Sequence, residues 1–247
     1  MSAWREAFRA IRMRLVAAVW AGTLVLIMLG VVWLQIPDSH VWEFVFSILF
    51  ACGLLALFFW CCSWVSKRML KPAEKERWWL QWILLAAVIV AWSLLQMPID
   101  RLLDHRALYA GYWTSRLPHW LRGSRTYEHF LVLQDYVYFS LRLVVTGLLL
   151  PVAVVAGASR LRGSVGRIFG VWSGWWYWMV ALVCGWIAFA VSGKLTDWTP
   201  GHGLIAEMLS LLVRLGCVFT LDVLLACFLL AVIVVGLRRS EGSQISE

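Results

Sequence analysis

Residues 216–236 read GCVFTLDVLLACFLLAVIVVG, a run of 21 residues in which Asp222 is the only charged side chain. A helix of about 20 apolar residues crosses the roughly 30 Å hydrocarbon layer of a bilayer, because each residue adds about 1.5 Å of length. The run is continuously apolar, whereas a membrane β-strand alternates between apolar and polar residues. It therefore predicts a transmembrane helix.

Five earlier runs have the same character, so the sequence predicts an all-α polytopic integral membrane protein. We expect one membrane domain over residues 1–247, built as a bundle of six transmembrane helices. The composition agrees: 62% of the residues are hydrophobic and 15% are charged, with a mean hydropathy of +0.78. Soluble domains have about 45–50% apolar and about 25% charged residues. The predicted spans are 15–36, 42–65, 78–98, 131–156, 172–192 and 216–236.

The segments outside the spans have distinct characters. Residues 1–14 place apolar side chains at helical spacing beside arginines, which predicts an amphipathic lead-in lying in the headgroup layer. Residues 99–130 are expected to form a long outer loop that contains a short amphipathic helix. A second, turn-rich outer loop is expected at 193–207, and a flexible cytoplasmic tail at 237–247.

The basic residues indicate an orientation. Of the 22 Lys and Arg residues, fourteen fall on the face that holds the amino terminus and six on the other face. The remaining two are Arg142, within the fourth span, and Arg214, two residues before the sixth. Because cytoplasmic loops are enriched in Lys and Arg, both termini are predicted to be cytoplasmic. The opposite face then lies outside a plasma-type membrane, such as a bacterial inner membrane. The net charge of +8 is thus a topology signal, and we expect no nucleic-acid partner.

Cysteine and tryptophan have structural interpretations. The six cysteines all lie in predicted spans and form no C-x-x-C motif, which is typical of small buried hydrophobic residues. Many of the eighteen tryptophans lie near span ends, where indole rings favour the membrane interface. The run WSGWWYW at 172–178 is denser, and we expect one face of it to pack against neighbouring helices or a lipid headgroup. No cofactor is expected.

Spans four and six carry charged side chains at matching depths. Counted back from the arginines that follow each span, Arg142 and Asp222 lie about 27 and 24 Å from the cytoplasmic face. Asp135 and Arg214 lie about two helical turns further out. Both spans run from outside to inside, so Arg142 is expected to pair with Asp222, and Asp135 with Arg214. Glu207 extends this charged face outward.

These intramembrane charges leave three roles open. Ionisable side chains are costly in lipid and usually face a partner or a cavity. The commonest role is a matched pair that docks span four against span six. The alternatives are a polar cavity for the passage of an ion, a proton or a headgroup, and a catalytic role.

The five histidines fall in outer loops or at outer helix ends, together with several carboxylates. Histidine and carboxylate side chains are common metal ligands, although neither H-x-H nor H-E-x-x-H spacing occurs here. Ordinary interfacial histidines are the simplest interpretation, and an outer metal or headgroup site is the first alternative. Haem ligation is the second, although it normally needs histidines that face each other within the bundle. The residues of the candidate metal or headgroup site are Asp104, His105, Glu128, His129 and His202.

The chain carries neither a Walker motif nor the G-x-S-G string of rhomboid-like proteases, so an enzyme is not favoured. In helix count and interfacial lead-in it resembles six-span export permeases of the ABC type, without a shared residue motif. The first hypothesis is permease-like transport of a small anionic or lipid-type substrate, supported by the charged face of spans four and six and by the polar outer loops. The second is a non-catalytic subunit or scaffold of a larger membrane complex. A third is an outer-face enzyme for a lipid-linked substrate. The expected partners are membrane lipids and other membrane subunits or a second copy.

Overall fold

The computed structural model describes residues 13–36, 40–70, 78–123, 126–158, 165–197 and 203–244, and their regular structure is entirely helical. Six of the helices are long and apolar enough to cross a membrane, which confirms the number of predicted spans. These six are α2 (Met13–Leu34), α3 (Val41–Met69), α4 (Trp78–Asp104), α6 (Thr126–Gly157), α8 (Trp175–Asp197) and α9 (Leu204–Gln244). The shorter elements are α5 (Arg106–Arg116), α7 (Val165–Ser173) and a 3₁₀ turn at His119–Leu121.

Several helices extend beyond the predicted spans. Helix α9 has 41 residues and is about 60 Å long, roughly twice the hydrocarbon thickness. Residues 237–244, expected as a flexible tail, are therefore helical, and that expectation is wrong for them. Hydropathy marks only the segment inside the hydrocarbon, and a helix continues past it until a residue stops it. Of the expected lead-in, Met13 and Arg14 begin α2, and residues 1–12 lie outside the described residues.

The expected outer loop at 99–130 is largely helical. Helix α4 continues to Asp104, and α6 already begins at Thr126. Between them, α5 supplies the short amphipathic helix expected in this segment. Helices α4 and α5 together thus run along most of α6.

The fifth span begins later than predicted, because Gly174 separates the short helix α7 from α8. A Cβ atom at Gly174 would lie only 2.7 Å from Nε1 of Trp176, so this turn needs a residue without a side chain. The amide of Gly174 donates to the carbonyl of Val171, and the amide of Tyr177 donates to that of Gly174. The sequence did not predict α7, because its residues were divided between a loop and the next span.

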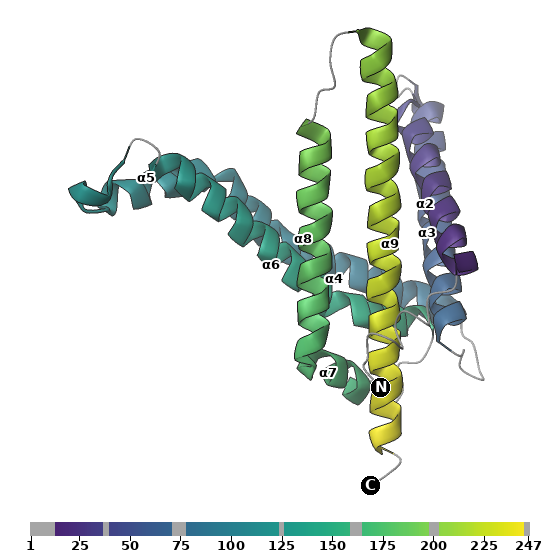
Figure 1. The fold of residues 1–247 in the computed structure, drawn as a ribbon. Coiled ribbons are helices and arrows are strands. Elements are labelled where there is room, and N and C mark those ends of the chain that lie inside the picture. The colour runs from purple at the N-terminus through teal and green to yellow at the C-terminus, as the bar shows by residue number, and fades with distance from the viewer. Residues whose placement is uncertain are drawn as a thin grey trace.

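The axes of α2, α3, α8 and α9 lie in a similar direction, and α4 and α6 cross it obliquely (Figure 1). Helices α2 and α3 lie side by side, and α9 packs against both α2 and α8. Helices α4 and α6 pack along each other and cross the other four obliquely, so that α5 lies far from α9. The all-helical class and the six apolar helices agree with the expectation.

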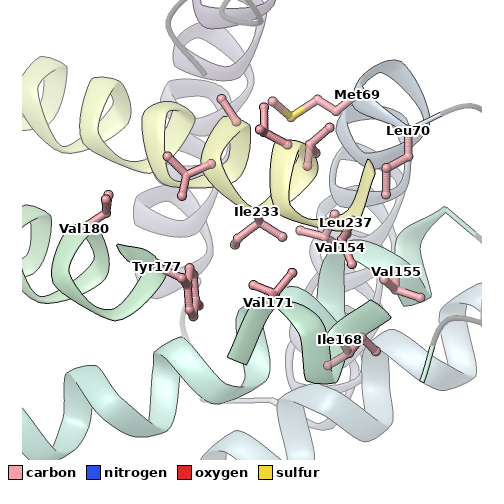
Figure 2. Close-up of a cluster of buried hydrophobic side chains, with 14 of the residues drawn as sticks. Met69, Leu70, Val154, Val155, Ile168, Val171, Tyr177, Val180, Ile233 and Leu237 are labelled. Carbon is pink, nitrogen blue, oxygen red and sulfur yellow. The ribbon is translucent and has the colours of Figure 1, made fainter. Parts of the chain in front are cut away.

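The main hydrophobic core lies at one end of the molecule, where α3, α6 and α9 meet α7 and the start of α8 (Figure 2). Val171 and Ile233 face each other at its centre and are fully buried. Tyr177, also fully buried, donates its hydroxyl hydrogen to the carbonyl of Gly147 in α6, 2.5 Å away. The aromatic run at 172–178 thus packs against neighbouring helices, as the sequence predicts.

A polar junction joins α3, α4 and α6 beside this core. The Ser63 hydroxyl lies 2.9 Å from Oε1 of Gln81 and 3.2 Å from the carbonyl oxygen of Gly157. Ser63 and Gln81 are both buried, and the single hydroxyl hydrogen of Ser63 is within reach of either oxygen acceptor. The junction attaches the α4–α6 pair to α3 near one end of the pair.

The start of α2 lies beside the middle of α9, and the two helices run in opposite directions. Val16 packs against Val223 and Cys227, and Trp20 Nε1 donates to the Thr220 hydroxyl at 3.3 Å, which makes the two helices antiparallel. An even number of crossings requires this arrangement. Which face is cytoplasmic remains a prediction from the charges.

The junction gives a first prediction: Gly157→Ala should destabilise the protein. The added Cβ would lie 2.6 Å from the Ser66 hydroxyl oxygen and 3.0 Å from the Ser66 Cβ, so α3 and α6 would have to separate. Such overpacking costs about 1–3 kcal/mol. Thermal unfolding in detergent, followed by tryptophan fluorescence, should show a lower midpoint.

Gly53→Ala is the matched control for Gly157→Ala. A Cβ at Gly53, in the middle of α3, would meet nothing within 4 Å. Alanine favours the helix by about 1 kcal/mol over glycine, so this midpoint should stay equal or rise. A Gly157→Ala midpoint as high as that of Gly53→Ala would contradict the close contact.

Candidate functional site

The charged side chains of α6 pair with the α4–α5 segment. Arg142 Nη2 donates to Asp100 Oδ1 at the end of α4, and Arg106 Nη1 of α5 donates to Asp135 Oδ1. These two ion pairs replace the expected pairs of Arg142 with Asp222 and of Asp135 with Arg214. The prediction of matched charges is therefore wrong in its choice of partner helix.

The antiparallel packing of α6 explains the change of partners. Helices α4 and α5 follow α6 along its length, so Asp100 lies opposite Arg142, and Arg106 opposite Asp135. Sequence reasoning missed Asp100 and Arg106 because both fall past the apolar run of the third span and were assigned to a loop. A usable signal was present: their spacing of six residues, with opposite signs, matches the spacing of seven between Asp135 and Arg142.

Arg214 serves a different structural purpose from the one expected. Its Nη1 donates to the carbonyl of Leu195 at 3.1 Å, and its Nε donates to the carbonyl of Ser210 at 3.2 Å. Leu195 lies in the last turn of α8, whose carbonyls lack partners within the helix and carry partial negative charge. Arg214 thus caps α8 and joins it to α9. Glu207 lies exposed in the first turn of α9, where a helix favours negative charge.

Asp222 stands apart from the other predicted site residues. It is exposed on α9 between apolar neighbours, and no described residue forms a hydrogen bond or an ion pair with its carboxylate. It borders a cavity of about 380 Å³ between α6, α8 and α9. Two hydroxyl residues, Thr146 and Ser192, border the same cavity, whose other lining is almost entirely apolar.

Thr146 in this cavity is already engaged. Its hydroxyl donates to the carbonyl of Arg142 at 2.8 Å and accepts a hydrogen bond from Trp92 Nε1 at 3.1 Å. The second of these bonds holds α6 against α4. Thr146 therefore supports the α4–α6 pair on one side and lines the Asp222 cavity on the other.

The candidate outer-face metal site is not assembled by the described residues. Asp104, His105, Glu128 and His129 are all exposed, and no group of three or more His, Cys, Asp or Glu side chains that could hold a metal ion occurs in the part of the chain that is described. The register explains the separation. His105 is next to Arg106, which pairs with Asp135 of α6. His129 is six residues before Asp135, about 9 Å away along the axis of α6. His202 lies outside the described residues.

The ion pairs give a second prediction, which a double-mutant cycle tests. Asp100→Ala and Arg142→Ala should each lower the unfolding midpoint in detergent or nanodiscs more than the double variant does, because an unpaired charge in lipid is the costly species. Contacting residues show interaction energies of about 0.5–3 kcal/mol.

The outer pair provides an internal comparison for this cycle. Asp135 lies seven residues before Arg142, so the pair of Arg106 and Asp135 is about 10 Å closer to the N-terminal end of α6. The interaction energy of this pair should be smaller than that of Asp100 and Arg142. Purely additive effects of Asp100→Ala and Arg142→Ala would show that the inner pair contributes nothing to stability.

Comparison of the chain with protein-family models, curated proteins and solved structures finds no match. Its function is therefore argued from the geometry of its own residues.

Proposed function

We propose that this chain is a non-catalytic subunit of a larger membrane assembly, and that it contacts its partner through α9 around Asp222. The observation that carries the proposal is the single carboxylate of Asp222, which lies in an apolar helix without a partner among the described residues. An acidic side chain at the centre of a membrane helix costs about 2.5–3.5 kcal/mol on insertion scales, and such residues almost always face protein or a water-filled cavity. A cation from another chain would remove this cost.

The outer half of α9 supports the proposal, because its apolar side chains are largely unpacked. Leu212 is 71% exposed, although Arg214 donates to α8 and Thr220 accepts a hydrogen bond from Trp20 of α2. Lipid or another protein must cover these side chains in the membrane. Those in the first part of the helix that are at least half exposed are Ile205, Met208, Leu209, Leu212, Val213 and Leu215.

The partner is proposed to be a different protein and not a second copy of this chain. Arg142 is the one cation within the predicted spans, and Arg214 lies two residues before the sixth. Arg142 is paired with Asp100, and Arg214 donates to backbone carbonyls of α8 and α9. Neither is available to a second copy without breaking a contact that supports the fold. A basic residue in a transmembrane helix of another subunit meets the need of Asp222 without that loss.

Transport is the second candidate, and the cavity beside Asp222 is the observation that favours it. A carboxylate with two neighbouring hydroxyl residues suits a proton or a small cation better than the anionic substrate expected from the sequence. The two intramembrane ion pairs weaken this candidate, because they join α6 to α4 and α5 and do not border the cavity.

The third prediction tests the subunit proposal with Asp222→Asn. Extracted from its native membrane in mild detergent, the wild-type chain should migrate in a complex larger than itself with a defined second protein. Asp222→Asn removes the charge with little change in shape, so it should release this protein. The free energy of unfolding of the chain should stay within about 0.5 kcal/mol of wild type.

Glu207→Gln is the matched control, since it removes another carboxylate of α9, from an exposed position in the first turn. This variant should retain the partner. Migration of the wild-type chain alone, or retention of the partner by Asp222→Asn, would contradict the subunit proposal. Cation or proton flux by the purified chain in vesicles, abolished by Asp222→Asn, would establish transport in its place.

A further inference from the structure

A second and larger cavity lies between α2, α3, α4, α6 and α9. Its volume is about 500 Å³, which is within the roughly 300–1,000 Å³ of small-molecule sites. Its lining is almost wholly apolar and shares no residue with the cavity beside Asp222. Representative lining residues are Ala18, Gly22, Trp64, Leu85, Leu150 and Leu230.

The pairing of α2 with α3 places two arginines at one end of this cavity. A Cβ at Gly22 would lie 3.9 Å from Sγ of Cys61, and Trp33 Nε1 donates to the Ser47 hydroxyl at 3.0 Å. Continued to the start of α2, this antiparallel register brings Arg14 opposite Arg68. Ala18 borders the cavity, and Arg14 is one helical turn, about 6 Å, beyond it on the same side of α2.

Arg68 is connected to the cavity wall directly. Its guanidinium carbon lies 5.4 Å from the centre of the Trp64 ring, and Trp64 lines the cavity. Arg14 and Arg68 are both exposed, and neither forms an ion pair with a described residue. Two guanidinium groups without an ion-pair partner among the described residues therefore lie at one end of the apolar cavity. Guanidinium groups bind phosphate oxygens with matched, charge-assisted hydrogen bonds.

We propose that this cavity holds an acyl chain of an anionic phospholipid, whose phosphate lies between Arg14 and Arg68. An acyl chain gains little by leaving the bilayer for an apolar cavity, because both surroundings are hydrocarbon-like. Selectivity therefore comes from the headgroup. Basic pockets between membrane helices bind anionic headgroups, and the positive-inside orientation predicted from the sequence puts this pair of arginines in the cytoplasmic leaflet, where anionic lipids are enriched.

The fourth prediction uses the full chain purified in detergent, with phosphatidylglycerol and phosphatidylcholine as probes. Native mass spectrometry should show retained phosphatidylglycerol. This lipid should raise the unfolding midpoint at a concentration at least about tenfold lower than phosphatidylcholine requires, because hydrogen bonds between charged groups are the strong ones. The Arg14→Gln/Arg68→Gln double variant should lose this preference.

The control variant is Arg116→Gln. Arg116 also lies over an aromatic ring, 5.2 Å from the centre of Tyr112, but it belongs to α5, which does not line the cavity. It should keep the wild-type lipid preference. Gly22→Leu tests the cavity itself: it places a side chain where the nearest neighbour is at ordinary contact distance, and it should abolish lipid retention with both arginines intact.

Equal retention of the two lipids by the wild-type chain would overturn the proposal, and so would a preference for phosphatidylglycerol that survives both sets of variants. Inorganic phosphate that stabilises the chain as well as phosphatidylglycerol does would also overturn it, because the acyl chain would then contribute nothing. If a variant fails to fold, the comparison of the two lipids and phosphate on the wild-type chain decides. These measurements use the purified chain without a protein partner. A negative result for the lipid proposal therefore says nothing about the proposed partner at α9, which is tested separately by co-purification.

Discussion

The close approach of α3 and α6 at Gly157 is the constraint on which the rest of the structure depends. The Ser66 side chain occupies the space that a Cβ at Gly157 would need, and the Ser63 hydroxyl joins the Gly157 carbonyl to the Gln81 side chain of α4. No water is available in the hydrocarbon to satisfy such groups, so they hold one another in place. Helices α4 and α6 are thereby attached to the other spans near one end, and the remainder of the pair crosses those spans obliquely (Figure 1).

The consequences of this crossing can be followed along α6. At Gly147 the helix is still held to α8, because Tyr177 donates to its carbonyl, and at Leu143 it packs where a Cβ of Gly185 would be. At Arg142 the nearest countercharge belongs to α4, so the guanidinium pairs with Asp100. The cavity between α6, α8 and α9 lies at this level, and Asp222 borders it. Because Arg142 pairs with Asp100 of α4, it does not pair with Asp222.

The apolar runs predicted the number of spans, because each span depends on a single segment. They could not predict the partners of the charged residues, because these depend on how the segments pack. The six spans follow from hydropathy, because each helix pairs its own backbone groups and its apolar side chains favour hydrocarbon whatever it packs against. The matched depths of Arg142 and Asp222 assumed parallel packing of two spans, and the glycine contacts that set the crossing of α6 leave no mark on hydropathy. Asp100 and Arg106 were assigned to the outer loop because they follow the apolar run that ends at Pro98, although α4 continues through Pro98 to Asp104 and α5 begins at Arg106. Gly174, which divides α7 from α8, acts through the neighbouring Trp176 ring, and that contact exists only in three dimensions.

Basic residues of α9 find backbone acceptors at the ends of neighbouring helices, whereas an acidic residue in the middle of the helix, such as Asp222, finds no free backbone donor. Arg214 and Arg238 donate to carbonyls in the last turns of α8 and α3. Such acceptors are available at every helix C-terminus, because the last four carbonyls of a helix lack internal partners. A carboxylate needs donors, and the unpaired backbone donors of a helix lie at its N-terminus, where Glu207 is found. Asp222 lies four to five turns further along α9, where the backbone amides are engaged in the helix itself. Its partner must therefore be a side chain, a proton or a bound cation, and in the described part of this chain no side chain takes that place.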